Sequence, residues 1–404
     1  MNILYISQWL SSVGGGGEVV FRDVAHGISQ NGHHVHVIRH RLADSKEDNE
    51  FGSDNSSVDN DAAGLHIHKI RPVVRGFPPS LRQNLMFIAN AILKGSKIVR
   101  RHRIELIHVN NFAPVVAGSI LSKLFGIPLV STIHVVFGAS SPDFWKKWSS
   151  QNNVSPMSSF IGPMFENLTI RIPVDTIHSV SNTTKKDILK VNSKSNVVVI
   201  PNGIDLAVYD KYAPDIEYQN YVVYIGRLVF NKNLETVISS FVEVIKNIED
   251  AKLVVIGFGP MLEEWRQLAA RLGLARNVQF TEYIDQERKI NILSKSSALV
   301  LPSVAEGMPV VALEAFALFK PVLLSDIEPH HDIVTDGTDG FIIPAHDVGK
   351  WSEKIIHVLS NKKASMDLGR NARSKAESKF NMNKTLREIE SLYYTCVHDA
   401  KSRS

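Results

Sequence analysis

The feature that most constrains the fold is the regular alternation of short apolar runs with longer amphipathic stretches throughout the 404 residues. Strands that alternate with helices of this length predict parallel sheets built from β-α-β units. The runs are continuously apolar, as in strands covered by helices on both faces. We therefore predict an α/β protein. Strands are expected at Asn2–Ser7, His34–Arg39, Leu65–Ile70, Leu106–Val109, Pro128–Thr132, Thr176–Val180, Val197–Ile200, Tyr221–Ile225, Lys252–Ile256, Val278–Phe280, Ala298–Leu301, Pro321–Leu324 and Gly340–Ile343, and amphipathic helices at Val19–Gln30, Leu81–Arg101, Leu234–Ile248 and Met261–Leu272.

The chain is too long for one ordinary domain and fits two. Pro201-Asn202-Gly203 follows a predicted strand and precedes a loop, after which the alternation of strands and helices starts again. We predict a domain boundary there. Two other regions interrupt the pattern. Leu42–Gly64, rich in Asp, Ser and Asn, is expected to be a surface loop, and Ser140–Ser159 is either a flap near an acceptor or a surface insertion.

Several classes of protein are excluded by simple counts. No run reaches the ~18 apolar residues that a membrane-spanning helix requires. Met1–Ser7 lacks a basic segment and is expected to be the first core strand, not a signal peptide. The single cysteine, Cys396, excludes an internal disulfide framework and a cysteine-rich metal site. These features predict a cytoplasmic protein.

Charge is unevenly distributed along the chain. Residues 1–200 carry 21 Lys and Arg against 14 Asp and Glu, whereas residues 201–404 carry 24 against 27. The predicted helix Leu81–Arg101 combines apolar residues with Lys94, Lys97, Arg100 and Arg101. Such a helix can lie on an anionic membrane surface, and we predict peripheral contact with the inner face of the membrane. A core-facing helix with a solvated basic face remains the alternative.

Glycine turns follow one strand in each half of the chain. Gly14-Gly15-Gly16-Gly17 leads from the first strand into a helix, and Gly257-Phe258-Gly259-Pro260 follows Lys252–Ile256. Glycines let the backbone approach a ligand, and free N–H groups at a helix N-terminus favour phosphate. Neither turn fits the G-x-G-x-x-G or P-loop pattern, which disfavours a dinucleotide oxidoreductase. Two such turns predict two ligand sites, although plain flexible turns are the alternative.

Two cations follow the strand Tyr221–Ile225. Arg227 comes directly after Gly226, and Lys232 lies five residues further on. Cations at the carboxyl edge of a parallel strand can clamp a diphosphate and stabilise the charge on a leaving nucleotide. Solvent-facing basic residues are the alternative when these two are considered alone.

The stretch from Leu301 to Ala315 contains two carboxylates on either side of a predicted helix start. The N–H groups from Gly307 to Val311, apart from that of Pro309, are expected to be available for a phosphate or sugar hydroxyls. Glu306 and Glu314 are eight residues apart, at most about 12 Å along a helix axis. This spacing suits the two ends of one ligand better than a pair of glycosidase carboxylates. A structural salt bridge of Glu314 is the alternative.

These motifs together resemble one known family. The segment Glu306–Glu314 is similar to the E-x7-E motif of retaining GT-B glycosyltransferases, family 4 in particular. The resemblance covers almost the whole chain. It implies two Rossmann-like domains with parallel sheets that face a central cleft, at residues 1–200 and 201–381, with a last helix at about residues 382–400 that packs back on the first domain. The other matching segments are Gly14–Gly17, Val130–His134, Ile200–Asp205, Tyr224–Arg227 with Lys232, and Lys320–Val322.

The resemblance also implies a role for each candidate residue. Arg227 and Lys232 would hold the donor diphosphate, Glu314 would bind the ribose, and Glu306 would contact the transferred sugar. His134 would face that sugar from the first domain. The remaining donor-binding residues would be Gly16, Gly17, Gly226, Gly257, Gly259, Gly307, Met308, Pro309, Val310 and Val311.

The implied activity is sugar transfer, with retention, from a nucleotide-diphosphate sugar to a glycan or lipid-linked acceptor in cell-surface or extracellular glycan biosynthesis. No metal or other cofactor is expected: Asp59-Asn60-Asp61 has the spacing of a metal site but lies in the predicted loop. Nucleic acid is not an expected partner. Two alternatives stay open, an epimerase of nucleotide sugars with the same architecture and a non-catalytic protein that binds nucleotide sugars.

Overall fold

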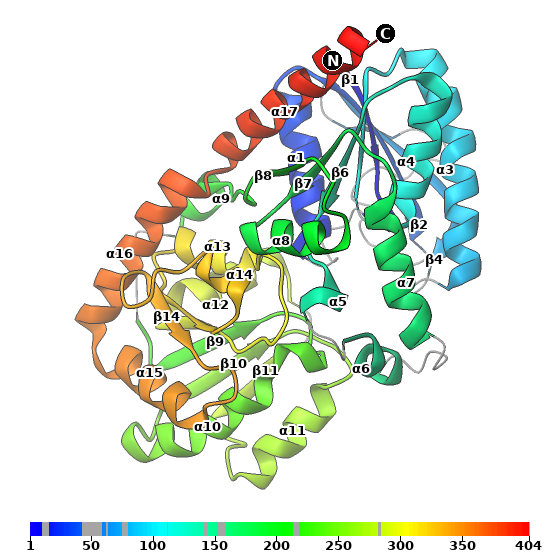
Figure 1. Cartoon of the computed structure of the whole chain (residues 1–404). Coiled ribbons are helices and arrows are strands. Elements are labelled where there is room, and N and C mark those ends of the chain that lie inside the picture. The colour runs from blue at the N-terminus through cyan, green and yellow to red at the C-terminus, as the bar shows by residue number, and fades with distance from the viewer. Residues whose placement is uncertain are drawn as a thin grey trace. The chain divides into compact units, whose positions relative to one another are not determined.

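The computed structural model describes residues 1–9, 16–42, 59–61, 64–74, 80–110, 112–140, 144–151, 158–212, 218–281 and 284–403. The described chain forms two compact units, each with its own sheet (Figure 1). The first unit contains Met1–Val136, Gly162–Pro201 and Thr385–Ser404, and the second contains Phe137–Ile161 and Asn202–Lys384.

The first unit is built on an eight-stranded sheet of order β3-β4-β2-β1-β5-β6-β7-β8. Every neighbouring pair is parallel except β3 with β4. The strands are β1 (Asn2–Ile6), β2 (His34–Leu42), β3 (Asp59–Asp61), β4 (Leu65–Val74), β5 (Leu106–Val109), β6 (Leu129–Ile133), β7 (Thr176–Ser179) and β8 (Val197–Val199). The helices are α1 (Gly16–Gln30), α3 (Leu81–His102), α4 (Ala113–Phe125), α7 (Ser158–Arg171), α8 (Asn182–Val191) and α17 (Met382–Arg403).

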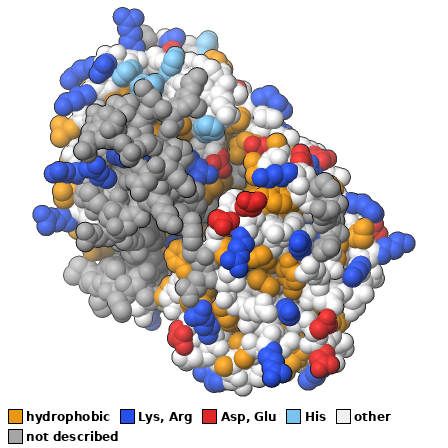
Figure 2. Space-filling model, turned by 180° about the vertical axis from the view of Figure 1, so that it is seen from behind, with side chains coloured by type: hydrophobic (Ala, Val, Ile, Leu, Met, Phe, Trp, Pro, Cys, Tyr) orange, Lys and Arg blue, Asp and Glu red, His pale blue; other side chains and the backbone are white. Residues whose placement is uncertain are grey.

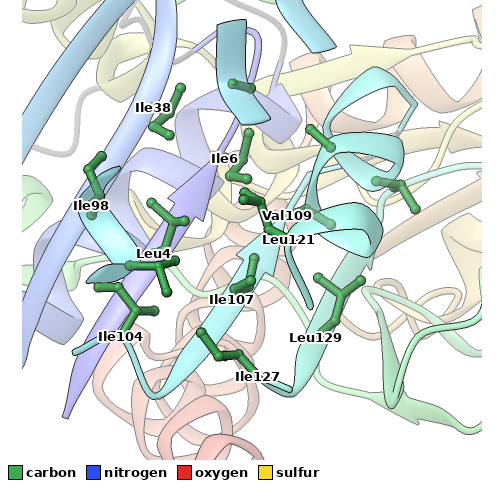
Figure 3. Close-up of a cluster of buried hydrophobic side chains, with 14 of the residues drawn as sticks. Leu4, Ile6, Ile38, Ile98, Ile104, Ile107, Val109, Leu121, Ile127 and Leu129 are labelled. Atoms are coloured by element: carbon green, nitrogen blue, oxygen red, sulfur yellow. The ribbon is translucent and has the colours of Figure 1, made fainter. Parts of the chain in front are cut away.

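Helices cover both faces of this sheet, as the continuously apolar strands predict. Leu4 and Ile6 of β1 point to one face, where they pack with α3, α4 and the neighbouring strands (Figure 3). Tyr5 points to the other face, where its ring lies 5.0 Å from that of Phe21 on α1. Gly95 allows α3 and α4 to approach closely, because a Cβ there would lie 2.5 Å from Leu121.

The second unit is built on a six-stranded parallel sheet of order β11-β10-β9-β12-β13-β14. The strands are β9 (Tyr221–Ile225), β10 (Lys252–Ile256), β11 (Val278–Thr281), β12 (Ala298–Leu301), β13 (Val322–Ser325) and β14 (Gly340–Ile343). The helices are α5 (Phe137–Ser140), α6 (Phe144–Gln151), α9 (Leu206–Asp210), the 3-10 turn η1 (Phe230–Lys232), α10 (Leu234–Asn247), α11 (Leu262–Arg271), α12 (Gln286–Lys295), α13 (Val310–Ala317), α14 (Glu328–His331), α15 (Val348–Ser360) and α16 (Lys362–Lys379).

The predicted strands are all present, and the α/β prediction is confirmed. Their ends agree with the expected ones within one residue except in β2 and β4, which continue three and four residues further, to Leu42 and Val74. One prediction was wrong: Asp59-Asn60-Asp61 was expected in a loop but forms β3, which pairs with β4. The compact units also differ from the expected domains, since Phe137–Ile161 groups with the second unit. The cause is an aromatic contact: Phe144 stacks on Phe137 at 4.2 Å and reaches Phe230 of η1 at 5.5 Å.

A chain of buried hydrogen bonds ties α17 to the first sheet. His178 Nε2 lies 2.8 Å from the Ile200 carbonyl, which can only accept, so this nitrogen carries the proton and Nδ1 accepts from Thr132 at 2.9 Å. Thr132 therefore accepts from His108 Nε2 at 2.7 Å, and His108 Nδ1 accepts from Tyr393 at 2.5 Å. Tyr393 in turn accepts from Tyr5. Each of these five side chains thus has its hydrogen-bond partners while it is in its neutral form.

This network predicts acid sensitivity. Burial lowers the pKa of His178 to about 4, although the bond to Ile200 acts to raise it, and burial also lowers the pKa of His108. Below pH ~6.5 these histidines bind protons in the unfolded chain but not in the folded one. The contribution of His178 to the free energy of unfolding is therefore complete above that pH and is lost toward pH 4, a change of about 3 kcal/mol. Urea midpoints at pH 7.5, 6 and 5 check this. A urea midpoint that did not change between pH 7.5 and 5 would contradict this prediction. So would a His178→Gln variant whose midpoint depends on pH as steeply as that of the wild type.

Candidate active site

The strand order of the second sheet shows where a ligand would bind. The chain leaves β9 toward β10 on one side, whereas β12 lies on the other side and leads to β13. Loops diverge at such a switch point and leave a crevice at the carboxyl ends of the strands. The loop after β9 carries Arg227 and Lys232, and the loop after β12 carries Glu306. The predicted site residues of this unit therefore come from both sides of the switch point.

Lys232 and Glu306 form an ion pair across the switch point. Lys232 Nζ donates to Glu306 Oε1, and the side chains are only 16% and 12% exposed. Ser303 Oγ donates to the same carboxylate oxygen at 2.8 Å. Burial acts to raise the pKa of Glu306, but the charge and hydrogen bond of Lys232 outweigh it and hold the pKa below its ordinary value. Glu306 is therefore an ionised carboxylate with a fixed orientation.

Two asparagines that flank Lys232 hold the two loops together. Asn231 Nδ2 donates to the Ala305 carbonyl at 3.0 Å, and the Asn231 carbonyl accepts from the Val304 N–H at 2.8 Å. Asn233 Nδ2 donates to the carbonyls of Pro302 and Ala345. Neither asparagine was predicted from the sequence. The signal was the Asn-Lys-Asn triplet itself, because side-chain amides beside a functional cation can bind the backbone of a neighbouring loop.

His330 is connected to Glu306 through two serines. Its Nδ1–H donates to the Ser325 carbonyl at 2.7 Å, and the Ser325 hydroxyl donates to the Ser303 carbonyl. Burial lowers the pKa of His330 to about 4, while the Glu306 charge acts to raise it. A neutral imidazole thus fixes Ser325, which in turn bonds to the backbone of Ser303, the serine that donates to Glu306. Sequence reasoning did not single out His330, because its partners lie on different segments.

Gly257 and Gly259 shape the loop that carries Arg227. A Cβ at Gly257 would lie 1.9 Å from the Gly226 carbonyl oxygen, and one at Gly259 would lie 2.3 Å from that of Leu228. Both glycines have positive φ angles, 153° and 154°. They let the turn after β10 pack directly on the turn after β9, which places Arg227 at the surface. Contact of these glycines with a donor stays a prediction.

The second carboxylate, Glu314, lies inside α13 and is 93% buried, as its 7% exposure shows. Lys289 of α12 contacts its Oε1 at 2.9 Å, whereas Oε2 is buried and has no hydrogen-bond partner among the described residues. Before this helix, Asn202 Nδ2 donates to the Met308 carbonyl at 3.3 Å. This contact explains the Pro-Asn-Gly segment, whose asparagine holds the loop that precedes Pro309, the residue at the helix start.

The first unit carries its own candidate residues at the switch point between β1 and β5. The helix α1 begins at Gly16, and a Cβ at Gly17 would lie 2.8 Å from the His134 ring. Both ring nitrogens of His134 are buried without a hydrogen-bond partner among the described residues. Burial lowers its pKa to about 3, so the imidazole is neutral at physiological pH. Buried polar groups without a partner are rare in folded proteins, and both nitrogens of this imidazole are left with the capacity to bond to a ligand. Gly14 and Gly15 lie outside the described residues.

Two further geometric findings concern metals and membranes. Within the described ranges, no three His, Cys, Asp or Glu side chains converge in a geometry that could hold a metal ion. The side chains of Asp59 and Asp61 lie outside the described part of the chain. No described helix is both long and apolar enough to cross a bilayer.

Comparison with known proteins covers most of the chain. Residues 14–208 match the model of Glycosyltransferase Family 4, and residues 211–375 match that of Glycosyl transferases group 1. The chain is 25% identical over 341 residues to UDP-Gal:alpha-D-GlcNAc-diphosphoundecaprenol alpha-1,3-galactosyltransferase of Escherichia coli, a match that spans 80% of this chain and 84% of that one.

Solved structures of the same fold match over nearly the full length. Sucrose-phosphate synthase from Thermosynechococcus elongatus has a TM-score of 0.79 at 19% identity and covers 98% of both chains. Anabaena HepE in complex with UDP-glucose has a TM-score of 0.74 at 18% identity, over 98% of this chain and all of that one. These likenesses show the fold, GT-B, as the resemblance of the motifs predicts.

Proposed function

The chain belongs to the family 4 glycosyltransferases of the GT-B fold, enzymes that use nucleotide-sugar donors, and we propose that it transfers a hexose with retention to a lipid-linked glycan acceptor. The observation that carries the proposal is the buried Lys232–Glu306 ion pair at the switch point of the second sheet. One member can bind phosphate and the other sugar hydroxyls, so together they fit the two parts of a donor that the reaction separates.

In the proposed mechanism, Arg227 and Lys232 bind the donor diphosphate and neutralise the charge that develops on it as the bond to the sugar breaks. Glu306 accepts hydrogen bonds from the sugar, and the first N–H groups of α13 hold its remaining hydroxyls. The acceptor oxygen attacks from the face that the diphosphate leaves, and its proton passes to a leaving phosphate oxygen. No metal is required, because the two cations take its place.

Donor binding tests this proposal directly. We expect one of UDP, GDP and ADP, or its sugar conjugate, to raise the melting temperature of the protein by an amount that EDTA does not change. The shift should be lost in Glu314→Ala, since that variant removes the carboxylate assigned to the ribose. If no nucleotide shifts the melting temperature, the proposed donor site is wrong. Free sugar or epimer formed without acceptor would favour the epimerase alternative.

The proposal of a lipid-linked acceptor rests on the solvent-exposed face of α3 and α4. Neither helix contains Asp or Glu. Burial and then the neighbouring Lys97 and Arg101 lower the pKa of Lys94, so these cations repel one another. An anionic surface would relieve that repulsion. Apolar side chains are exposed among the cations, and Figure 2 shows blue and orange side chains along the outer border of the first unit. The exposed apolar residues are Leu81, Leu85, Met86 and Leu93 of α3 and Ile120 and Leu124 of α4.

The acceptor of the E. coli relative, a GlcNAc-diphosphoundecaprenol, supports this choice, because such a polyprenol would reach the enzyme from a membrane. We propose a cytoplasmic protein that binds the inner face of the membrane through this surface.

Vesicle cosedimentation checks the membrane proposal. We expect the protein to sediment with vesicles that contain phosphatidylglycerol and much less with pure phosphatidylcholine, and the difference should shrink at high salt. Lys97→Glu with Arg100→Glu should abolish the preference. The matched control is Arg271→Glu with Arg276→Glu, two exposed residues of the second unit, which should behave as the wild type. Equal sedimentation with both kinds of vesicle would contradict the proposal.

A further inference from the structure

The environment of Glu314 contains a partner that the proposed function does not use. Glu314 is the carboxylate assigned to the ribose, and it projects from the middle of α13. Its side chain is 10% exposed, and Oε2 is buried without a hydrogen-bond partner among the described residues. A buried carboxylate oxygen that bonds to nothing is destabilising, and a hydroxyl that reaches it would remove that cost. Oε2 is thus the atom prepared for a ligand.

The other oxygen, Oε1, is already occupied. Lys289 Nζ donates to it at 2.9 Å, from a side chain that is only 19% exposed. Lys289 stands in the first half of α12, which follows β11 and therefore begins at the carboxyl edge of the sheet. This is the same edge that carries Arg227, Lys232 and Glu306. The ammonium consequently lies at the edge of the sheet where the ligand is proposed to bind. A purely structural ion pair could lie at either edge.

We propose that Lys289 and Glu314 act together as a clamp for the two hydroxyls of the nucleotide ribose. The inference rests on the proposed function, since it requires a nucleotide donor. Glu314 Oε2 accepts a hydrogen bond from one hydroxyl. Lys289 keeps one N–H on Oε1 and donates another to the oxygen of the neighbouring hydroxyl, because an ammonium has three donors and no acceptor. A carboxylate alone cannot donate, so the pair recognises a diol more selectively than Glu314 by itself.

The clamp has three consequences. Lys289 neutralises the charge of Glu314 in the low-dielectric interior, which a bound ribose hydroxyl could not do. It fixes the carboxylate so that Oε2, and not Oε1, faces the ligand. It also makes binding depend on both ribose oxygens. Lys289 is therefore a residue for specificity that distinguishes ribonucleotides from deoxyribonucleotides.

The test compares nucleotides that differ only in the ribose. The probe is whichever of UDP, GDP and ADP the wild-type full chain binds, together with its 2′-deoxy and 3′-deoxy forms, measured by calorimetry. We expect the wild type to bind each deoxy form more weakly. Lys289→Met should weaken binding of the ribonucleotide about tenfold and bring the ribo- and deoxynucleotide affinities closer together, and Lys289→Arg should restore part of the difference.

Two controls separate the clamp from a structural ion pair. Arg288→Met changes the adjacent exposed residue of α12 and should bind as the wild type. Inorganic pyrophosphate lacks the ribose, so its affinity should be equal in the wild type and in Lys289→Met. If Lys289→Met weakens pyrophosphate as much as the nucleotide, the residue supports the fold only and the clamp is overturned.

The remaining outcomes distinguish the clamp from the function on which it rests. If nucleotides bind, Glu314→Gln weakens them and Lys289→Met leaves both the affinity and the ribo-to-deoxy ratio unchanged, the clamp is wrong and the donor site stands. If no nucleotide binds the wild type at all, the proposed function itself is overturned, and the clamp with it.

Discussion

Replacing Glu306 by Gln is expected to lower kcat/KM by about 10²- to 10³-fold. The amide keeps the shape of the carboxylate but removes its charge, so it holds neither Lys232 nor the sugar hydroxyls as strongly. Lys232→Met should cost a similar factor, because it removes the cation from the leaving diphosphate. The double variant should be little worse than either single one, since the two side chains form one unit and their effects do not add. Steady-state kinetics with the identified donor measures all three.

A surface ion pair of the same kind provides the control for this prediction. Lys246 and Glu243 on α10 lie 2.8 Å apart, but their side chains are 64% and 54% exposed. Exposed pairs contribute little, so Glu243→Gln should retain wild-type activity and stability. The melting temperature of Glu306→Gln must be recorded beside its activity, because Lys232 loses its buried partner. A Glu306→Gln enzyme that keeps its fold and works within threefold of the wild type would contradict the proposed site.

Replacing Tyr393 by Ala is expected to destabilise the first unit by about 5 kcal/mol and to lower its melting temperature by about 10 °C or more. The side chain is fully buried and lies in the chain of hydrogen bonds between Tyr5 and His108. The truncation leaves a cavity, and it also leaves the His108 acceptor and the Tyr5 hydroxyl without partners. Tyr393→Phe keeps the ring and loses only the hydroxyl, so it should cost about 2 kcal/mol.

The adjacent residue is the matched control. Tyr394 is 58% exposed on the same helix, so Tyr394→Ala should unfold within about 0.5 kcal/mol of the wild type. Chemical denaturation followed by circular dichroism compares the three variants. If Tyr393→Ala and Tyr394→Ala proved equally stable, the hydrogen-bonded chain and the packing of α17 would not support the first unit as described.

The elements of the fold could be predicted because their signals are local. A strand such as Lys252–Ile256 or Ala298–Leu301 is a continuous apolar run between polar turns, and its ends are marked in the sequence itself. The strand β3 was missed because Asp and Asn have low strand propensity. Its three residues form a strand only because β4 presents an edge to which they can pair.

The candidate site divides in the same way. Arg227, Lys232, Glu306 and Glu314 were named from strand ends and from spacing along the chain. The partners of these residues were not, because they come from segments that only folding brings together. Asn231 reaches across 74 positions to Ala305, and Lys289 reaches 25 positions to Glu314. No periodicity or motif in the sequence records such contacts.

By itself, then, the sequence determined the class of fold and the approximate positions of its elements, and it predicted the family and the candidate site residues. Apolar periodicity, glycine turns and the spacing of charged residues are properties of short segments, and they act before any long-range contact forms. The tertiary structure alone decided which lysine neutralises which glutamate, which atoms stay unpaired and which histidines stay neutral. Those properties depend on burial and on distances between remote segments, and burial exists only in the folded chain.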